Sequence, residues 1–109
     1  MTVKDLIDKG QFGTVVLPCP DKEIAGVYVG DLLSWVMGRA QSGNAWITIM
    51  SNLNIVAVAT LADVSCIILA EGVTLDAQVS DTAKAKDVNI LATDMTAYEL
   101  AVAMSGLGL

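Results

Sequence analysis

Two short apolar runs, separated by a segment of the right length for one crossover, constrain the fold of this chain most strongly. The runs are Trp46–Met50 and Cys66–Ala70, and small or polar residues end each of them. The segment between them, Ser51–Ser65, is long enough to cross over a sheet and return parallel to the first run. This spacing predicts a β-α-β unit with the two runs as neighbouring parallel strands.

The middle of that segment, Ile55–Ala62, fits two structures. Its β-branched residues favour a strand, whereas its alanines and Leu61 favour a helix. We predict a buried helix, because a third strand would leave no room for the crossover. The helix is expected to begin at Ser51, Asn52 or Asn54, since each of these residues is a good N-cap.

Strand and helix patterns alternate along the rest of the chain, with glycine, proline and polar residues between them. The fold class predicted is therefore α/β, a single three-layer domain over residues 1–109 with a largely parallel sheet and helices on both faces. The other expected strands are Thr14–Leu17 (an interior strand), Val27–Val29 and Asn89–Ala92. The other expected helices are Val3–Lys9, Leu32–Ala40 capped by Asp31, Leu75–Lys86 capped by Thr74, and one with a Thr96–Glu99 capping box that ends at Gly106.

The charge of the chain argues against nucleic acid as a partner. The net charge is −6, and the six basic residues are scattered rather than clustered. No apolar run reaches the roughly 18 residues of a membrane span, and the N-terminus lacks the apolar region of a signal peptide. We therefore expect a soluble, cytoplasmic protein. Apolar residues make up 54% of the chain, which indicates enough exposed apolar surface for self-association. Trp35 and Trp46 are expected to pack in the core or in a dimer interface, and the alternative is that they stack on a ligand.

The residue types limit the chemistry. The sequence has no histidine and no phosphate-binding glycine motif, which removes the common nucleophilic triads and most zinc sites. The cysteines, Cys19 and Cys66, are expected to be reduced and structural, with no metal between them. Catalytic residues and cofactors are expected to be none, although an acid–base pair could lie among the four carboxylates Asp31, Asp63, Glu71 and Asp94.

Position in the expected sheet indicates where a ligand could bind. Ligands of open α/β sheets bind beyond the carboxyl ends of the strands, where helix N-termini converge and backbone N–H groups can hold an anion. The loops concerned are 30–31, 51–54, 71–74 and 93–96. The candidate ligand-binding residues are Gly30, Asp31, Ser51, Asn52, Asn54, Thr93 and Thr96. The alternative interpretation is that Asp31, Asn52, Asn54, Thr74 and Thr96 serve only as helix caps.

Three segments resemble the DRTGG domain family. They read VYVGDLLSWVMGRA from Val27, AWITIMSNLNIVAVATLAD from Ala45 and CIILAEG from Cys66. The resemblance covers residues 27–107 and depends on the pattern GDLLS…WITI…NIVAVA…IIL, because the pentapeptide that names the family is absent. The family is similar in fold to the N-terminal domain of HPr kinase/phosphorylase, so the same α/β fold is implied.

The resemblance implies a regulatory role rather than a reaction. Members are attached to phosphotransacetylases, inserted between CBS domains in inorganic pyrophosphatases, or stand alone, and no catalytic residues can be carried over. The serine-kinase label given to some members does not transfer, because that activity belongs to a separate P-loop domain. Since the domain lies at a subunit interface in pyrophosphatases, the resemblance also implies a homodimer. The first hypothesis is a regulatory module that senses a small anionic or nucleotide-like ligand and acts on a partner enzyme. The alternative is a dimerisation or interaction module without a small-molecule ligand, and a kinase or other enzyme is the weakest hypothesis.

Overall fold

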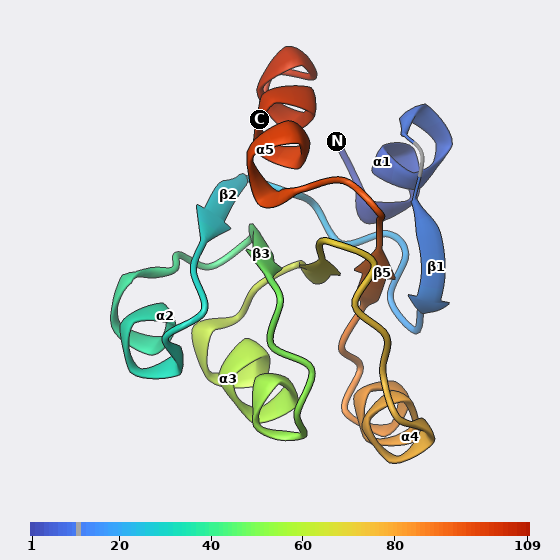
Figure 1. Cartoon of the computed structure of the whole chain (residues 1–109), viewed down its shortest axis with the longest axis vertical. Coiled ribbons are helices and arrows are strands. Elements are labelled where there is room, and N and C mark those ends of the chain that lie inside the picture. Colours follow the sequence, from blue (N-terminus) through green and yellow to red (C-terminus); the bar gives the residue numbers. More distant parts are fainter. Residues whose placement is uncertain (11) are drawn as a thin grey trace.

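A five-stranded sheet separates two layers of helices in the computed structural model, which describes residues 1–10 and 12–109 (Figure 1). The strand order is β1-β5-β4-β3-β2, in which β2 to β5 are parallel and β1 is antiparallel to β5. The strands are β1 (Gly13–Val16), β2 (Gly26–Val29), β3 (Asn44–Thr48), β4 (Cys66–Leu69) and β5 (Ile90–Ala92). The prediction of a largely parallel α/β sheet is confirmed.

The central β-α-β unit is also confirmed. Strands β3 and β4 are parallel neighbours, paired from Ala45↔Cys66 to Thr48↔Leu69. Between them, α3 (Asn54–Ala62) is a helix that buries Ile55, Val56, Val58 and Ala59. The apolar and β-branched composition of this segment therefore reflects burial against the sheet, and it does not produce a strand.

Connectivity determines which helix covers which face. Strands β2 to β5 are neighbours in chain order, so right-handed crossovers place α2 (Leu33–Arg39), α3 and α4 (Ala77–Ala85) on one face. Their side chains pack with Trp46 and Ile67 in one buried cluster. Helices α1 (Val3–Lys9) and α5 (Ala97–Gly106) cover the other face and pack with Ile47 and Ile68 in a second cluster (Figure 1). The predicted three layers are present.

The prediction of an interior strand over Thr14–Leu17 is wrong in one respect. The strand exists, but β1 lies at an edge of the sheet. Val16 lies in the core, whereas Val15 is 39% exposed. Its register shifts between Thr14 and Val16, and Pro18 follows soon after. A short apolar run that is followed by prolines fits an edge strand as well as a central strand, and only the strand order distinguishes the two.

Three predicted helix caps are wrong, and one is confirmed. Helix α3 has Leu53 as its N-cap rather than Ser51, Asn52 or Asn54. Helix α2 has Leu32 as its N-cap, with no side-chain hydrogen bond, and Asp31 instead bonds to the end of β3. Helix α4 begins two residues later than predicted, so its N-cap is Asp76 rather than Thr74. The Thr96–Glu99 capping box of α5 is present with both of its hydrogen bonds. None of the helices among the described residues has the length and hydrophobicity to cross a membrane.

Candidate functional site

The carboxyl ends of β2 to β5 all lie at the same end of the sheet. The candidate ligand-binding residues divide into two groups there. Asp31 follows β2 and Thr93 follows β5, at opposite ends of the parallel part of the sheet. Neighbouring strands lie about 4.8 Å apart, so three steps separate these loops by roughly 14 Å. The residues predicted from the sequence therefore do not form one site.

The first group lies beside β2 and β3. The hydrogen bonds of its polar groups are made to neighbouring parts of the protein. Asp31 Oδ1 accepts hydrogen bonds from Thr48 Oγ1 at 2.8 Å and from Ile49 N at 3.0 Å. The Gly30 carbonyl accepts a hydrogen bond from the buried Trp46 indole at 2.8 Å. These contacts fix the loop after β2 against the end of β3.

The rest of the first group surrounds the start of α3. Asn52 Oδ1 accepts a hydrogen bond from Asn54 N at 3.0 Å, so Asn52 closes a turn just before the helix. The N-cap itself is Leu53, and Ser51 is half-buried in the preceding loop. Asn54 lines an apolar groove between α3 and α4 rather than the edge of the sheet.

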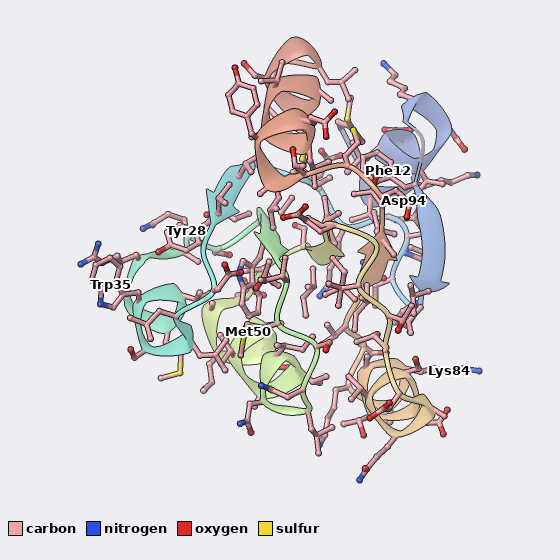
Figure 2. The ribbon with its side chains drawn as sticks, viewed as in Figure 1. Phe12, Tyr28, Trp35, Met50, Lys84 and Asp94 are labelled. Atoms are coloured by element: carbon pink, nitrogen blue, oxygen red, sulfur yellow. The ribbon has the colours of Figure 1, made fainter. Side chains whose placement is uncertain are left out.

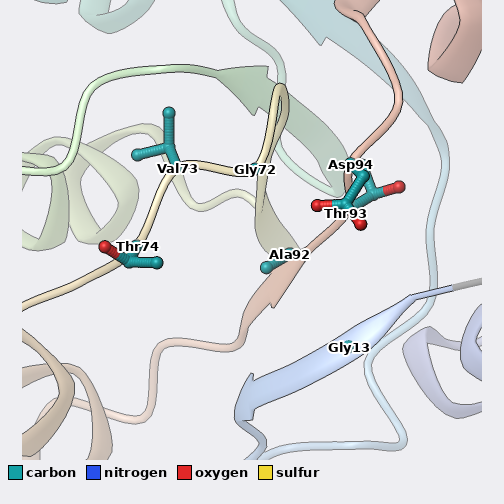
Figure 3. A pocket seen from close by; sticks show the side chains of 7 residues that line it. All are labelled: Gly13, Gly72, Val73, Thr74, Ala92, Thr93 and Asp94. Atoms are coloured by element: carbon teal, nitrogen blue, oxygen red, sulfur yellow. The ribbon is translucent and has the colours of Figure 1, made fainter.

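The second group lies beside a pocket between β4 and β5. The chain goes to α4 on one face after β4 and to α5 on the other face after β5, so the two loops diverge. Ligands of open α/β sheets bind at such a switch point. A pocket of about 260 Å³ is present there (Figure 3). It is lined by Gly13, Gly72, Val73, Thr74, Ala92, Thr93 and Asp94. Of the candidate residues, only Thr93 lines it.

Backbone hydrogen bonds hold the two loops of this pocket together. Gly72 N donates to the Thr93 carbonyl at 3.0 Å, and Glu71 N donates to the Met95 carbonyl at 2.8 Å. Glu71 and Gly72 both have positive φ, 61° and 72°, which turns the chain sharply after β4. A Cβ on Gly72 would lie 3.2 Å from Asp94 Oδ1, so a larger residue there would disturb both the turn and the pocket wall.

The polar side chains of the pocket offer hydrogen bonds and one negative charge. Thr93 is buried, and its Oγ1 accepts a hydrogen bond from Met95 N at 3.2 Å. Thr74 and Asp94 are exposed on opposite sides of the pocket (Figure 3). The sequence has no Lys or Arg between Ala40 and Ala83, and none of the lining residues is basic. The lining suits hydroxyl and amino groups better than it suits phosphate.

The capping box of α5 lies next to this pocket, and its polar groups form hydrogen bonds with each other. Thr96 lies three residues beyond Thr93, and its backbone N–H and hydroxyl both engage Glu99. The hydrogen bond from the Thr96 backbone, followed by that from its side chain, holds the pKa of the Glu99 carboxyl below its usual value. Thr96 therefore acts as a cap in this structure, and it does not line the pocket.

Four carboxylates could have supplied an acid–base pair, and the structure separates them. Asp63 ends α3 at the amino end of the sheet, where it bonds to Ser42. Asp31 lies beside β2, as described above. Only Glu71 and Asp94 occupy neighbouring loops, and Glu71 does not line the pocket. The described residues contain no group of three or more potential metal-ligating side chains.

The sequence indicated part of this pocket and missed the rest. The loops 71–74 and 93–96 were both expected at the carboxyl edge, and Asp94 was one of the four carboxylates considered. Gly13 could not be found, because nothing in the sequence shows that β1 pairs with β5. The meeting of these two loops likewise depends on the strand order and on the faces that the helices cover.

The fold and the pocket define a small three-layer α/β domain with one switch point. Its sequence matches the DRTGG domain family over residues 21–107, so the chain belongs to that family. A similar solved structure is that of the CBS and DRTGG domains of the regulatory region of Clostridium perfringens pyrophosphatase, complexed with activator, diadenosine tetraphosphate. The TM-score is 0.69 at 16% identity, over 90% of this chain and 43% of that chain. The chain thus spans less than half of the pyrophosphatase fragment. A search of curated proteins finds no match.

Proposed function

We propose that this chain is a non-catalytic regulatory module that binds a nucleotide-like ligand in the pocket between the β4–α4 and β5–α5 loops. The observation that carries this proposal is a pocket at the switch point of the sheet, lined by two threonines and one carboxylate. Membership of the DRTGG family supports it, since a relative in fold belongs to a regulatory region complexed with a nucleotide activator. The ligand would order the two loops, and a partner protein would bind differently to the ordered loops.

The size and charge of the pocket indicate which part of such a ligand it holds. Its volume of about 260 Å³ is below the roughly 300–1,000 Å³ of pockets that enclose a drug-sized ligand. A carboxylate such as Asp94 accepts hydrogen bonds from the two hydroxyls of a ribose, as acidic residues near strand ends do in dinucleotide-binding folds. We therefore assign the sugar to the pocket. Phosphates would extend into solvent, away from Asp94 and without a neighbouring cation.

The direct test is thermal unfolding with adenosine, AMP and diadenosine tetraphosphate, each also titrated by calorimetry. A ligand that binds only the folded state at a hundredfold excess over its Kd stabilises by about 2.7 kcal/mol. For a domain of this size that amounts to a rise in Tm on the order of 10 °C. We expect adenosine to bind at least as tightly as AMP at low salt, because the chain is acidic.

Asp94→Asn separates binding from folding. Asp94 is exposed and the amide is of similar size, so the variant should fold normally while binding falls at least about tenfold through loss of charge-assisted hydrogen bonds. Asp81→Asn, an exposed carboxylate on α4 outside this pocket, is the matched control and should bind like the native chain. Equal affinity for all three proteins would remove the pocket from the proposal.

A second candidate function is protein interaction without a small-molecule ligand. It is favoured by large apolar side chains that remain exposed on the domain, among them Leu32, Trp35 and Met37. A chain that binds none of the three nucleosides and nucleotides but associates with itself or with a partner would support this candidate over the first.

A further inference from the structure

An apolar groove between α3 and α4 has a volume of about 510 Å³, nearly twice that of the pocket at the switch point. This volume lies within the roughly 300–1,000 Å³ of sites that enclose a small organic molecule. Its apolar lining comes from Leu53, Val56, Ala57 and Leu61. The α3–α4 groove shares no lining residue with the pocket, so it is a separate feature of the domain.

The groove is present because α4 does not pack closely against α3. Both helices lie on the same face of the sheet as α2, and α3 contacts α2 more extensively than it contacts α4 (Figure 1). Several of the side chains that line the groove are small, among them Ala57 and Thr60 of α3 and Thr82 of α4. They leave a space between the two helices that no side chain of this face fills.

The outer side of α3 is unusual for a surface helix because it carries no charge. None of the residues from Asn54 to Ala62 is charged, whereas the solvent side of a surface helix is normally rich in charged residues. Leu53 and Leu61, which both line the groove, are 42% and 73% exposed. An uncharged surface with exposed leucines beside a hollow is typical of a site that binds an apolar group.

Lys86 supplies the charge of this groove. It is the C-cap of α4 and the one charged residue among the described lining residues. In the described part of the chain, no carboxylate forms an ion pair with it. A lysine in this position places its alkyl stem along the apolar wall and its ammonium at the rim.

The threonines of the groove do not compete with Lys86 as donors. Thr60 Oγ1 donates to the Val56 carbonyl at 3.0 Å. Thr82 Oγ1 donates in the same way to the Gln78 carbonyl at 2.8 Å, so both hydroxyl protons are engaged within their own helices. A ligand that complements the groove therefore has an apolar body and one negative group at its end.

We propose that the α3–α4 groove binds a small, free carboxylate with an apolar chain of medium length, whose negative group pairs with Lys86. Each helix has nine residues, so the groove is at most about 14 Å long, too short for a long-chain lipid. A partner protein usually contributes roughly 20–30 residues to an interface, far more than line this groove. The net charge of −6 opposes attachment to an anionic membrane, which favours a free ligand.

Octanoate and octan-1-ol are the probes, titrated into the isotope-labelled native chain and followed by NMR. Octanoate should shift the amide signals of residues 56–61 and 82–86 and should bind more tightly than octan-1-ol. The affinity should rise from butanoate through hexanoate to octanoate by roughly two- to fourfold per methylene, since full burial of one methylene gives about fourfold.

Two lysines of the same helix end give a matched test of the charge. Lys86→Gln should weaken octanoate binding about fivefold, the upper end for an ion pair open to water, and should leave octan-1-ol binding unchanged. Lys86→Arg should restore the affinity for octanoate. Lys84→Gln is the control, because Lys84 does not line the groove and Figure 2 shows it directed away from α3. This control should bind octanoate like the native chain.

Two exposed alanines give a matched test of the hollow itself. Ala57→Phe places a ring in the groove and should weaken both octanoate and octan-1-ol at least about tenfold. Ala85→Phe places the same ring on α4 outside the groove and should bind both probes like the native chain. Circular dichroism verifies that each variant is folded. If Ala57→Phe does not fold, Lys86→Gln and Lys84→Gln decide the question by themselves.

A native chain in which octanoate at millimolar concentration shifts no amide of α3 or α4 overturns the proposal. Equal sensitivity to Lys84→Gln and Lys86→Gln overturns it as well, because the attraction would then be general rather than local. If octanoate does not bind but an acidic amphipathic peptide does, and Ala57→Phe abolishes that binding, the groove belongs to a partner protein and the proposal is wrong. Adenosine binding involves other residues, so each of these results leaves the nucleotide proposal to its own test.

Discussion

Asn89 holds together the amino end of the sheet, and its replacement by alanine should be among the most destabilising single changes in this chain. The side chain is 1% exposed. Its Oδ1 accepts a hydrogen bond from Cys19 N at 2.9 Å, and its Nδ2 donates to the Cys19 carbonyl at 2.7 Å and the Ser65 carbonyl at 3.0 Å. One amide thus joins the segment before β2 to the residues that precede β4 and β5.

The expected cost follows from the three hydrogen bonds to main-chain groups that alanine would remove. The hydrogen bond to the Ser65 carbonyl is buried, so its loss should lower the free energy of unfolding by about 1–3 kcal/mol. The two hydrogen bonds to Cys19 are half-buried, so water can replace them in part. We therefore expect their loss to lower the free energy of unfolding by about 1 kcal/mol in total. The total of about 3 kcal/mol is a large share of the roughly 5–15 kcal/mol that stabilise a domain. It corresponds to a fall in Tm of more than about 10 °C.

Urea unfolding measures this loss as a lower midpoint with an unchanged slope. Asn52→Ala is the control, because this exposed amide makes one local hydrogen bond and its loss should cost no more than about 1 kcal/mol.

Asn89→Asp adds a check on mechanism. An ionised carboxylate would face two carbonyl oxygens, so the folded state should raise its pKa. Stability of that variant should then be greatest at low pH and decrease as pH rises through the raised pKa. If Asn89→Ala loses no more than Asn52→Ala, the reasoning is refuted.

Three further predictions concern single groups. Burial raises the pKa of the Cys66 thiol to about 12, so at pH 8 mass spectrometry should show half-buried Cys19 labelled first and Cys66 only on unfolding. Trp46→Phe removes the bond to the Gly30 carbonyl and should lower the unfolding free energy by about 1–2 kcal/mol in urea. Thr96→Ala should cost about 1 kcal/mol. It should also move the lowered Glu99 pKa part of the way toward normal in an NMR titration, because the backbone hydrogen bond that lowers this pKa most is retained. The part that is removed is stabilisation that the native chain has at neutral pH and loses as pH falls through that pKa.

The central part of the fold could be predicted because its signal is local. Two apolar runs and the length between them determine β3, α3 and β4, whatever the rest of the chain does. The cap of α2 was predicted wrongly for a tertiary reason. Asp31 is drawn to the Thr48 hydroxyl and the Ile49 amide of the next strand, and these partners are close only once the sheet has formed. A capping rule that considers sequence neighbours alone cannot include them.

The candidate site was predicted as a set of loops and not as a pocket, because which loops meet depends on the faces that the helices cover. Helices α4 and α5 each bury one side, and neither sequence pattern states which face of the sheet receives that side. Three consecutive crossovers place α2, α3 and α4 together, and only after β5 does the chain cross to the face of α1. That single change of face opens the space between Thr74 and Asp94. It also leaves Asp31 three strands away, so a ligand bound between β4 and β5 cannot contact the β2 edge directly. Strand β3, which is buried along its whole length, lies between the pocket and that edge.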